Sequence, residues 1–377
     1  MPRRSRFSYL TSVVLLLTAA IFTAQWYALA QGLSPPKTLP EAVERARALI
    51  KEKFAPKVPG LSVAVAVEGK IVWSEGFGFA DLEKKTAVTP TTRFRIGSVS
   101  KPVTAAGLAL LVERGKLDLD APVQKYVPDF PDKGAMITTR MLAGHLAGIR
   151  HYKEGEFLLN KPFKNVREGL TIFENDPLVA PPGTKFVYST YGWNLISAVM
   201  EGAAKQEFLA YMQKSVFKRL GMKNTRPDNA STDDPQRTHF YDSRPPGEFV
   251  SAPAVDNSYK WAGGGFLSTP EDLVRFGSAH LQPGFLKKET LEMLFTSQRT
   301  SDGKETGYGI GWSILADAQG HRVMMHTGGS VGGTSVLLLH PDSKVVVAMV
   351  ANHSRSPFSK DAREAIVEFF VPLLAKK

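Results

Sequence analysis

Strand-forming segments lie near both ends of this 377-residue chain, and the stretch between them is rich in short helices and loops. Two apolar runs near the N-terminus, 61–67 and 70–79, flank the pair Glu68-Gly69 and predict a hairpin. Four more strand-like runs follow late in the chain, at 309–315, 321–327, 334–340 and 345–351. We therefore predict an α+β fold, with one antiparallel sheet built from both termini, flanked by helices, and a mostly helical insertion.

One domain is expected after a short N-terminal leader. We predict that it covers residues 31–377, with a sheet part at about 41–120 and 300–377 and a helical part at about 121–299. The outermost helices are expected over 41–54 and 359–374. The hydrophobic content of 43% is sufficient for one large core. A cleft is expected where the sheet part meets the helical part.

The first thirty residues have the pattern of a signal peptide. Three arginines, at positions 3, 4 and 6, precede an apolar run from about Leu10 to Tyr27, and Ala28-Leu29-Ala30 is a small-x-small cleavage site. Several polar residues interrupt the run, which disfavours a permanent membrane span. The prediction is a mature chain that starts at Gln31 and is periplasmic or secreted, with an uncleaved membrane anchor as the alternative.

The charge and cysteine content exclude some classes of function. Removing the three leader arginines from the formal net charge of +11 leaves +8, and acidic residues are interspersed among the basic ones. This distribution argues against nucleic-acid binding and is compatible with a loose attraction to anionic envelope surfaces. The chain has no cysteine, so neither disulfides nor thiol chemistry can operate.

The pattern S-x-x-K occurs four times, and its surroundings decide which copy can be catalytic. The four copies are Ser34/Lys37, Ser98/Lys101, Ser215/Lys218 and Ser301/Lys304. The first contains two prolines and the last contains Asp-Gly, so both are expected in loops. The third lies in an amphipathic run at 208–220, where it would occupy a solvated helix face. Only Ser98 stands at a helix entrance after a strand-like run.

Ser98 and Lys101 are the leading candidates for nucleophilic catalysis. The segment 94–102 reads as a strand, a tight turn and the start of a helix that extends to about Glu113 and stops at Gly115. Residues three apart on a helix are neighbours, and an amine whose pKa is lowered by burial or a nearby cation can take the serine proton. The N–H groups at the helix start would favour an oxyanion. The alternative interpretation is an ordinary N-cap serine.

A nucleophilic serine needs a proton-transfer partner and an oxyanion hole, and the sequence offers candidates for both. Tyr188 follows the turn Pro181-Pro182-Gly183 in the helical part. The segment His326-Thr327-Gly328-Gly329 ends an apolar strand in the sheet part. Taken alone, such a tyrosine is more often a core residue and such a histidine an ordinary strand residue. Their order and context favour the functional interpretation.

These three motifs, in this order, resemble those of the serine β-lactamase and penicillin-binding-protein superfamily, in the branch of class C β-lactamases, DD-peptidases and esterases. Members of that branch carry S-x-x-K, Y-x-N and K-T-G or H-T-G. The resemblance extends from about Leu61 to the C-terminus and includes the segments 141–149 and 262–273. It implies a β-lactamase/transpeptidase-like fold.

The resemblance also implies a role for each matching residue. Ser98 would attack the substrate carbonyl, Lys101 would assist its deprotonation, and Tyr188 would pass the proton to the leaving group. The backbone N–H groups of Ser98 and Gly329 would form the oxyanion hole. Which of Lys101 and Tyr188 carries the charge stays open at this level, because each shifts the pKa of the other.

Four residues are implied in substrate binding: Thr190, His326, Thr327 and Gly328. Thr190 stands where the family pattern has asparagine, and it lacks an amide that both donates and accepts hydrogen bonds. His326 stands where many members have lysine, and a neutral imidazole would bind a substrate carboxylate less strongly. Both departures favour a peptidase or esterase over a dedicated β-lactamase or DD-peptidase.

No metal or cofactor is expected. His145 is expected to be structural, with its ring bonded to backbone near the cleft. The eight histidines show no convincing ligand spacing, and His321 and His326, an odd number of residues apart on a strand, should face opposite sides.

The predicted function is an exported serine hydrolase that acts through an acyl-enzyme at Ser98 on a small-molecule or peptide substrate with an amide or ester bond. One alternative is a β-lactamase or D-alanyl-D-alanine carboxypeptidase. Another is a non-catalytic peptide-binding or scaffold protein that retains the fold. The sequence leaves the oligomeric state open.

Overall fold

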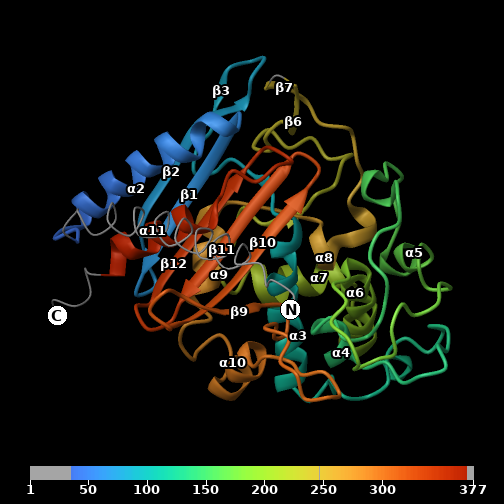
Figure 1. Cartoon of the computed structure of the whole chain (residues 1–377). Helices are drawn as coiled ribbons and strands as arrows, with labels where there is room; N and C mark the ends of the chain where they lie inside the picture. The colour runs from blue at the N-terminus through green and yellow to red at the C-terminus, as the bar shows by residue number, and fades with distance from the viewer. Residues whose placement is uncertain (1–34, 246, 372–377) are drawn as a thin grey trace, which may run out of the picture.

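A seven-stranded antiparallel sheet forms one side of the molecule (Figure 1). The computed structural model describes residues 35–245 and 247–371, so the predicted leader lies outside the described residues. The strands follow one another in this spatial order: β3 (Thr86–Ala87), β2 (Lys70–Asp81), β1 (Gly60–Val67), β12 (Val345–Ala351), β11 (Gly333–His340), β10 (Arg322–Ser330) and β9 (Ser313–Ala316). The prediction of one sheet built from both ends of the chain is confirmed.

The two ends of the chain meet where β1 pairs with β12. The register runs from Leu61 opposite Ala351 to Val67 opposite Val345. The predicted hairpin between β1 and β2 is also present, and its turn residues Glu68 and Gly69 both have positive φ, at 51° and 80°. This geometry is typical of the type I′ turn, whose twist matches that of the paired strands.

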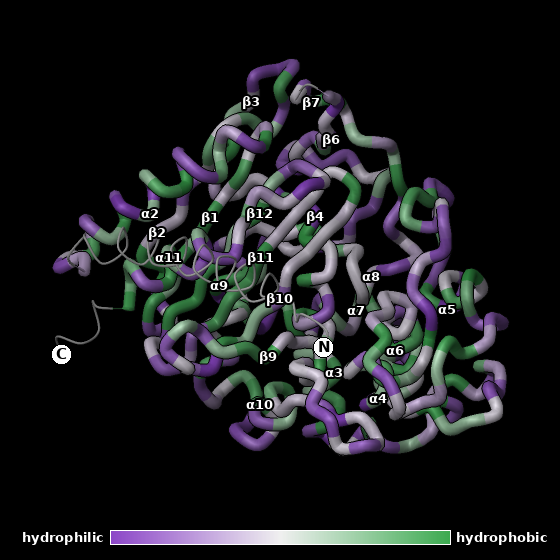
Figure 2. Tube along the Cα trace, in the orientation of Figure 1, coloured by the Kyte–Doolittle hydropathy of each residue, from purple (hydrophilic) through white to green (hydrophobic). Residues whose placement is uncertain are grey.

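Helices cover both faces of the sheet, so its central strands are apolar throughout. β11 and β12 are buried along their whole length. On the outer face, α2 (Leu39–Lys53) and α11 (Lys360–Phe370) lie side by side and share a core with alternate residues of the strands. On the inner face, α9 (Pro270–Ser278) packs on β1 and β12. Figure 2 shows α2 alternating hydrophobic and hydrophilic segments along its length, as expected of a helix with one buried face.

The helical part contains short helices and two small sheets. Its helices are α4 (Thr139–Ala143), α5 (Val166–Leu170), α6 (Thr190–Ala204), α7 (Phe208–Met212), α8 (Trp261–Gly264) and α10 (Lys288–Phe295). Its strands are β4 (Phe94–Arg95), β8 (Phe266–Ser268) and β5 (Arg226–Pro227) in one sheet, and β6 (Tyr241–Arg244) with β7 (Glu248–Ser251) in another. Within the described ranges, no helix has the length and apolar character needed to cross a membrane.

Two local predictions need correction. The strand expected over 309–315 is shorter and forms only β9. Gly311 has φ +80°, and the Gly309 N–H donates to the Trp312 carbonyl, so the residues before β9 form a turn. In the amphipathic helix expected over 208–220, the α-helical part ends at Met212 and is followed by a π-helical turn. This turn buries Ser215, which was expected on a solvated face. The described part of the last helix, α11, ends at Phe370, and residues 372–374 of the predicted helix lie outside the described residues.

The helix α3 (Ser100–Glu113) lies where the sheet part meets the helical part. It is buried over nearly its whole length and packs against α6 and α8. The 3-10 turn that precedes it, η2 (Gly97–Val99), packs against β10 and β11. Residues at the start of α3 therefore touch both parts of the molecule.

Candidate active site

The turn that carries Ser98 is held against β10 by glycines. Gly97 has φ +47°, and a Cβ atom there would lie 2.5 Å from the carbonyl oxygen of Gly329. Residue 97 must therefore be glycine for two reasons, its left-handed backbone and this close approach. This close contact between Gly97 and Gly329 places the half-buried Ser98 directly beside the glycine-rich end of β10.

Lys101 points back at Ser98 from the first turn of α3. Its Nζ lies within hydrogen-bond distance of three oxygens: Ser98 Oγ at 2.9 Å, Thr190 Oγ1 at 3.2 Å and the Gly263 carbonyl at 2.6 Å. The side chain is fully buried. Burial, followed by the charge of Lys260, holds the pKa of Lys101 well below its ordinary value. The amine is thus prepared to be neutral, as a general base must be.

Tyr188 lies beside the same amine. The Lys101 Nζ is 4.9 Å from the centre of the Tyr188 ring. Burial raises the pKa of Tyr188 to about 12, against the opposing effect of its hydrogen bond with Ser98. The structure thus brings together Ser98, Lys101 and Tyr188, which the sequence separates by up to ninety positions.

The N-terminus of α6 fixes the backbone next to Tyr188. Ser189 caps this helix, its Oγ accepting the Gly192 N–H at 3.0 Å and donating to the Arg150 carbonyl at 2.6 Å. The Ser189 N–H donates to His145 Nδ1 at 3.1 Å, and the rings of His145 and Tyr188 are 4.3 Å apart. The prediction that His145 bonds to backbone near the site is confirmed.

The end of β10 offers unpaired backbone beside Ser98. In the described part of the chain, β9 pairs with β10 only from Arg322 to Met325, so the edge from His326 to Ser330 has no strand on that side. The position where Gly329 would carry a Cβ has no atom within 4 Å. The Gly329 backbone therefore lies at an open edge next to the Ser98 turn, as an oxyanion hole requires.

The four residues expected to bind substrate differ in accessibility. Thr327 is exposed. Thr190 is buried, and its hydroxyl accepts from Lys101, so it serves the amine directly. Gly328 packs so closely on the Ile96 carbonyl that a Cβ would lie 2.0 Å from that oxygen. Close packing therefore explains why residue 328 lacks a side chain, and its role in substrate binding stays a prediction.

His326 is neutral and has both ring nitrogens engaged. Its Nδ1 donates to the Thr327 carbonyl at 2.6 Å, which leaves Nε2 to accept from the Tyr308 hydroxyl at 2.9 Å. Burial, followed by the charge of Lys101, lowers the pKa of His326 to about 3. The side chain cannot supply the positive charge that a lysine would offer there.

Lys260 is a second buried amine near the site, and our reading of the sequence did not single it out. It precedes α8, and its Nζ lies 4.6 Å from the ring centre of Phe157 and 5.0 Å from that of Tyr259. Among the described residues its ammonium has no hydrogen-bond acceptor or ion-pair partner. Burial and the charge of Arg95 lower its pKa to about 7, against the opposing effect of Asp228. The sequence does contain a signal for this residue, because Lys260 lies between Tyr259 and Trp261 shortly before three consecutive glycines.

A separate surface hollow lies elsewhere. Arg114, Arg219 and Phe285 help to line a space of ≈ 420 Å³ near the C-terminal end of α3. None of the predicted site residues contributes to it. We therefore locate the active site from the chemistry around Ser98 and not from the size of a hollow.

The family of the chain follows from this fold and from direct comparison. A family model described as Beta-lactamase matches residues 46–369, so the chain belongs to the beta-lactamase family. Members and structural neighbours of this family are serine hydrolases, and this chain is a serine hydrolase of the same class.

Individual relatives agree with this assignment. The chain is 33% identical to the human serine beta-lactamase-like protein LACTB, mitochondrial, over 90% of this chain and 82% of that protein. A solved octameric penicillin-binding protein homologue from Pyrococcus abyssi has a TM-score of 0.75 at 27% identity, over 89% of this chain and 78% of its own.

A more distant structure shares the fold. The D-amino acid amidase from Ochrobactrum anthropi SV3 has a TM-score of 0.75 at 22% identity, over 89% of this chain and 99% of its own.

Proposed function

We propose that Ser98 is the nucleophile of an acyl-enzyme hydrolase that acts on amide or ester bonds. The observation that carries the proposal is the buried Lys101 amine 2.9 Å from Ser98 Oγ. A neutral amine has two N–H groups and one lone pair. The Gly263 carbonyl and Thr190 Oγ1 can accept the two N–H groups, which directs the lone pair at the Ser98 hydroxyl.

Acylation then follows from the positions of these groups. Ser98 Oγ forms a bond to the substrate carbonyl carbon while its proton moves to Lys101. The oxyanion is stabilised by the backbone N–H groups of Ser98 and Gly329. The leaving amine or alcohol departs with a proton delivered through Tyr188. Water attacks the resulting ester, returns its proton to this network and releases the acid product.

The chemistry around His326 favours some substrates over others. β-Lactams and D-alanyl-D-alanine peptides carry a carboxylate, and a neutral His326 would hold it weakly. We therefore favour a peptidase or esterase of other specificity. The names of the relatives, which include a penicillin-binding protein homologue and a D-amino acid amidase, support amide bonds as the first substrates to test.

The leader supports export of the protein. Its arginines, apolar run and Ala28-Leu29-Ala30 site favour a periplasmic or secreted mature chain that starts at Gln31. N-terminal sequencing of protein recovered from a cell envelope fraction tests this. A mature chain that retains residues 1–30 would instead support the membrane anchor.

Labelling with a fluorophosphonate probe tests the nucleophile. The wild-type protein should react at Ser98, and Ser98→Ala should remain unlabelled while its circular dichroism spectrum is unchanged. Ser301→Ala is the matched control, because Ser301 begins another S-x-x-K pattern but lies exposed in a turn. Undiminished labelling of Ser98→Ala would refute the assignment. A folded wild-type protein that neither reacts nor turns over esters would favour the non-catalytic binding role.

A further inference from the structure

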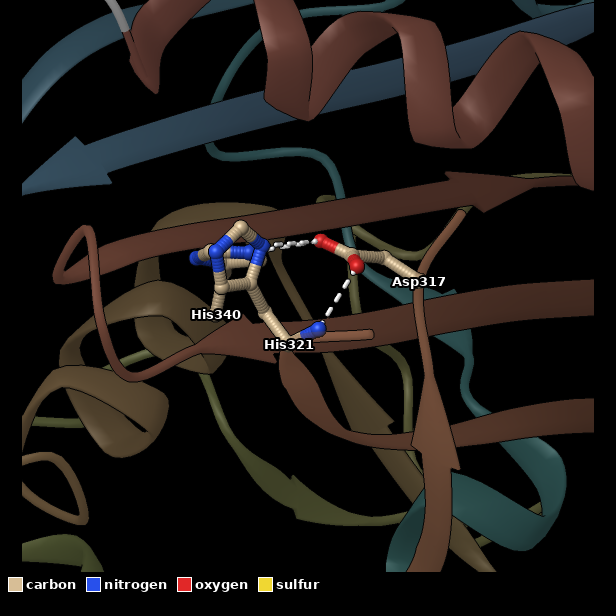
Figure 3. A group of neighbouring side chains, drawn as sticks. All are labelled: Asp317, His321 and His340. Atoms are coloured by element: carbon tan, nitrogen blue, oxygen red, sulfur yellow. Dashed lines mark hydrogen bonds and ion pairs between the residues drawn. The ribbon is translucent and has the colours of Figure 1, made fainter. Parts of the chain in front are cut away.

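Three side chains from separate segments converge near one end of the sheet, away from the catalytic turn. Asp317 follows β9, His321 precedes β10 and His340 ends β11. Figure 3 shows the two imidazole rings next to the carboxylate of Asp317. Asp317 Oδ2 lies 3.0 Å from His321 Nδ1 and 3.1 Å from His340 Nε2. One ligand atom from each residue lies within 4.8 Å of the others.

The fold holds this cluster in place from several directions. Asp317 Oδ1 accepts the backbone N–H groups of Gln319 at 2.9 Å and His321 at 2.8 Å, which leaves Oδ2 for the two rings. His340 is buried, and its Nδ1 accepts the Ser343 backbone N–H at 3.3 Å and lies 2.7 Å from Ser343 Oγ. A metal at Nε2 requires the ring proton on Nδ1, where Ser343 Oγ can accept it and fix the ring orientation. His321 is exposed, so its ring can adjust.

The donor atoms of the cluster suit a cation. A carboxylate oxygen and two imidazole nitrogens, one from each residue, all lie within 4.8 Å of one another and can each give an electron pair to one metal ion.

We propose that Asp317, His321 and His340 form a binding site for a divalent transition metal, with Zn²⁺ as the best match. Two imidazole nitrogens and one carboxylate oxygen are a donor set that Zn²⁺ accepts, with water as the fourth ligand. Tetrahedral bonds of about 2.0–2.1 Å place ligand atoms roughly 3.3 Å apart. Each nitrogen therefore has to move a few tenths of an ångström away from Asp317 Oδ2, and His321 has to turn towards His340, because the ligand atoms now lie within 4.8 Å of one another.

The site lies on the other face of the sheet from the active site. Leu337 and Leu339 face the inner core, whereas Leu338 faces the core shared with α2 and α11. His340 continues that alternation on the outer face. The metal would therefore tie the β9–β10 turn to the end of β11 and stabilise the sheet without joining in catalysis.

Titration of the chelator-treated full chain with ZnCl₂ at pH 7.5 tests the site. We expect saturable binding of one equivalent and a higher melting temperature. We also expect Co²⁺ to give the intense visible bands of four-coordinate geometry. His321→Ala should weaken Zn²⁺ binding at least about tenfold, and Asp317→Asn should do the same.

Two features keep the test decisive. His321 is exposed, so its replacement should leave the fold intact, and its unchanged melting temperature without metal verifies this. His239→Ala is the matched control, because His239 is exposed and bonds to Ala80 at the opposite end of the sheet. Zn²⁺ binding that survives in His321→Ala, or the lack of any saturable binding to the wild type, would overturn the proposal. Loss of binding in His239→Ala would do so as well.

Discussion

At the residue scale, the chemistry at Ser98 depends on two amines that are both removed from water. Lys101 is buried and hydrogen-bonded, whereas Lys260 is surrounded by aromatic rings. Like charges disfavour each other most where water is excluded, so the ammonium of Lys260 makes Lys101 easier to deprotonate. A lowered pKa is what allows an amine to act as a base near neutral pH.

Replacing Lys260 with methionine should shift the pH dependence of catalysis. The acid limb of kcat/KM reports deprotonation of Lys101, and the ammonium of Lys260 favours the neutral form of Lys101. Its removal should raise the pKa of Lys101 and move the acid limb to higher pH, with activity below pH 7 falling most. Measurement of kcat/KM for an ester from pH 5 to pH 10 tests this. Lys260→Arg should keep the wild-type limb, and an unchanged limb in Lys260→Met would contradict the coupling.

Replacing Gly97 with alanine should damage both stability and turnover. The positive φ costs about 1–3 kcal/mol for a residue with a side chain, and the new Cβ would also collide with the Gly329 carbonyl. A shift of the Ser98 turn by about 1 Å should lower kcat roughly 100-fold.

The matched control for that change is Gly115→Ala. Gly115 has φ +64° but nothing within 4 Å of its Cβ position. It should lose about 1–3 kcal/mol in urea unfolding, less than Gly97→Ala because no atom collides with the new Cβ, and keep full activity. Equal activity loss in both variants would show that the contact with Gly329 is unimportant.

At the element scale, short segments with special ends position the site. The sequence predicts α3 well, because its apolar residues and the Gly115 stop act locally. It also predicts the strand before Ser98, which is β4, but not β5 and β8, since strands of two or three residues have too little periodicity and exist through their neighbours. The same limit applies near 213–217, where a π-turn changes which residues face the core.

Loss of the N-cap of α6, Ser189, should affect the active site as well as stability. Ser189→Ala removes the hydroxyl that accepts from Gly192 and leaves the Arg150 carbonyl without its donor. We expect a loss of about 1–2 kcal/mol in urea unfolding and a decrease in kcat, because Tyr188 is the preceding residue. Thr38→Ala provides the comparison.

Thr38 caps α2 in the same way, accepting the Glu41 N–H at 3.3 Å on the far face of the sheet. Its variant should lose about 1 kcal/mol of stability or less, with kcat unchanged. A Ser189→Ala protein with wild-type kcat would show that Tyr188 is held by other contacts.

At the scale of the whole molecule, buried ion pairs join segments that are distant in the sequence. Arg95, next to the Ser98 turn, donates to Asp228 at 2.6 Å and to the Val331 carbonyl at 2.8 Å. Asn257 donates to the same Asp228 oxygen at 2.6 Å. These contacts connect the nucleophile strand, the helical part and the β10–β11 turn.

Removal of the Asp228 carboxylate should strongly destabilise the folded protein. Asp228→Ala leaves the Arg95 guanidinium buried without its counter-charge, and breaking such a pair costs about 3–5 kcal/mol. Asp120→Ala breaks the Arg140 pair, in which both side chains are partly exposed, and should cost about 1 kcal/mol or less. Urea unfolding of the two variants compares them directly. Similar losses of unfolding free energy in the two variants would show that the buried Arg95–Asp228 pair stabilises the fold no more than the partly exposed Asp120–Arg140 pair.

The sequence by itself determined the features that depend on neighbours along the chain. These are the hairpin at Glu68-Gly69, the entry of α3 after Ser98, the use of strands from both ends and the order of the three motifs. Periodicity, turn residues and helix stops act over a few residues, so they can be read without knowing what lies opposite.

Only the tertiary structure decided the features that depend on contacts across the molecule. It brought Lys260 near Lys101 and His326 into hydrogen-bond contact with Tyr308. It also placed His340 beside Asp317, a pair that the sequence does not predict. Charge, burial and hydrogen bonding set the pKa of each group, and all three are supplied by residues far away in the sequence. Their effects on an amine or an imidazole exist only after the sheet and the helical part have closed around it.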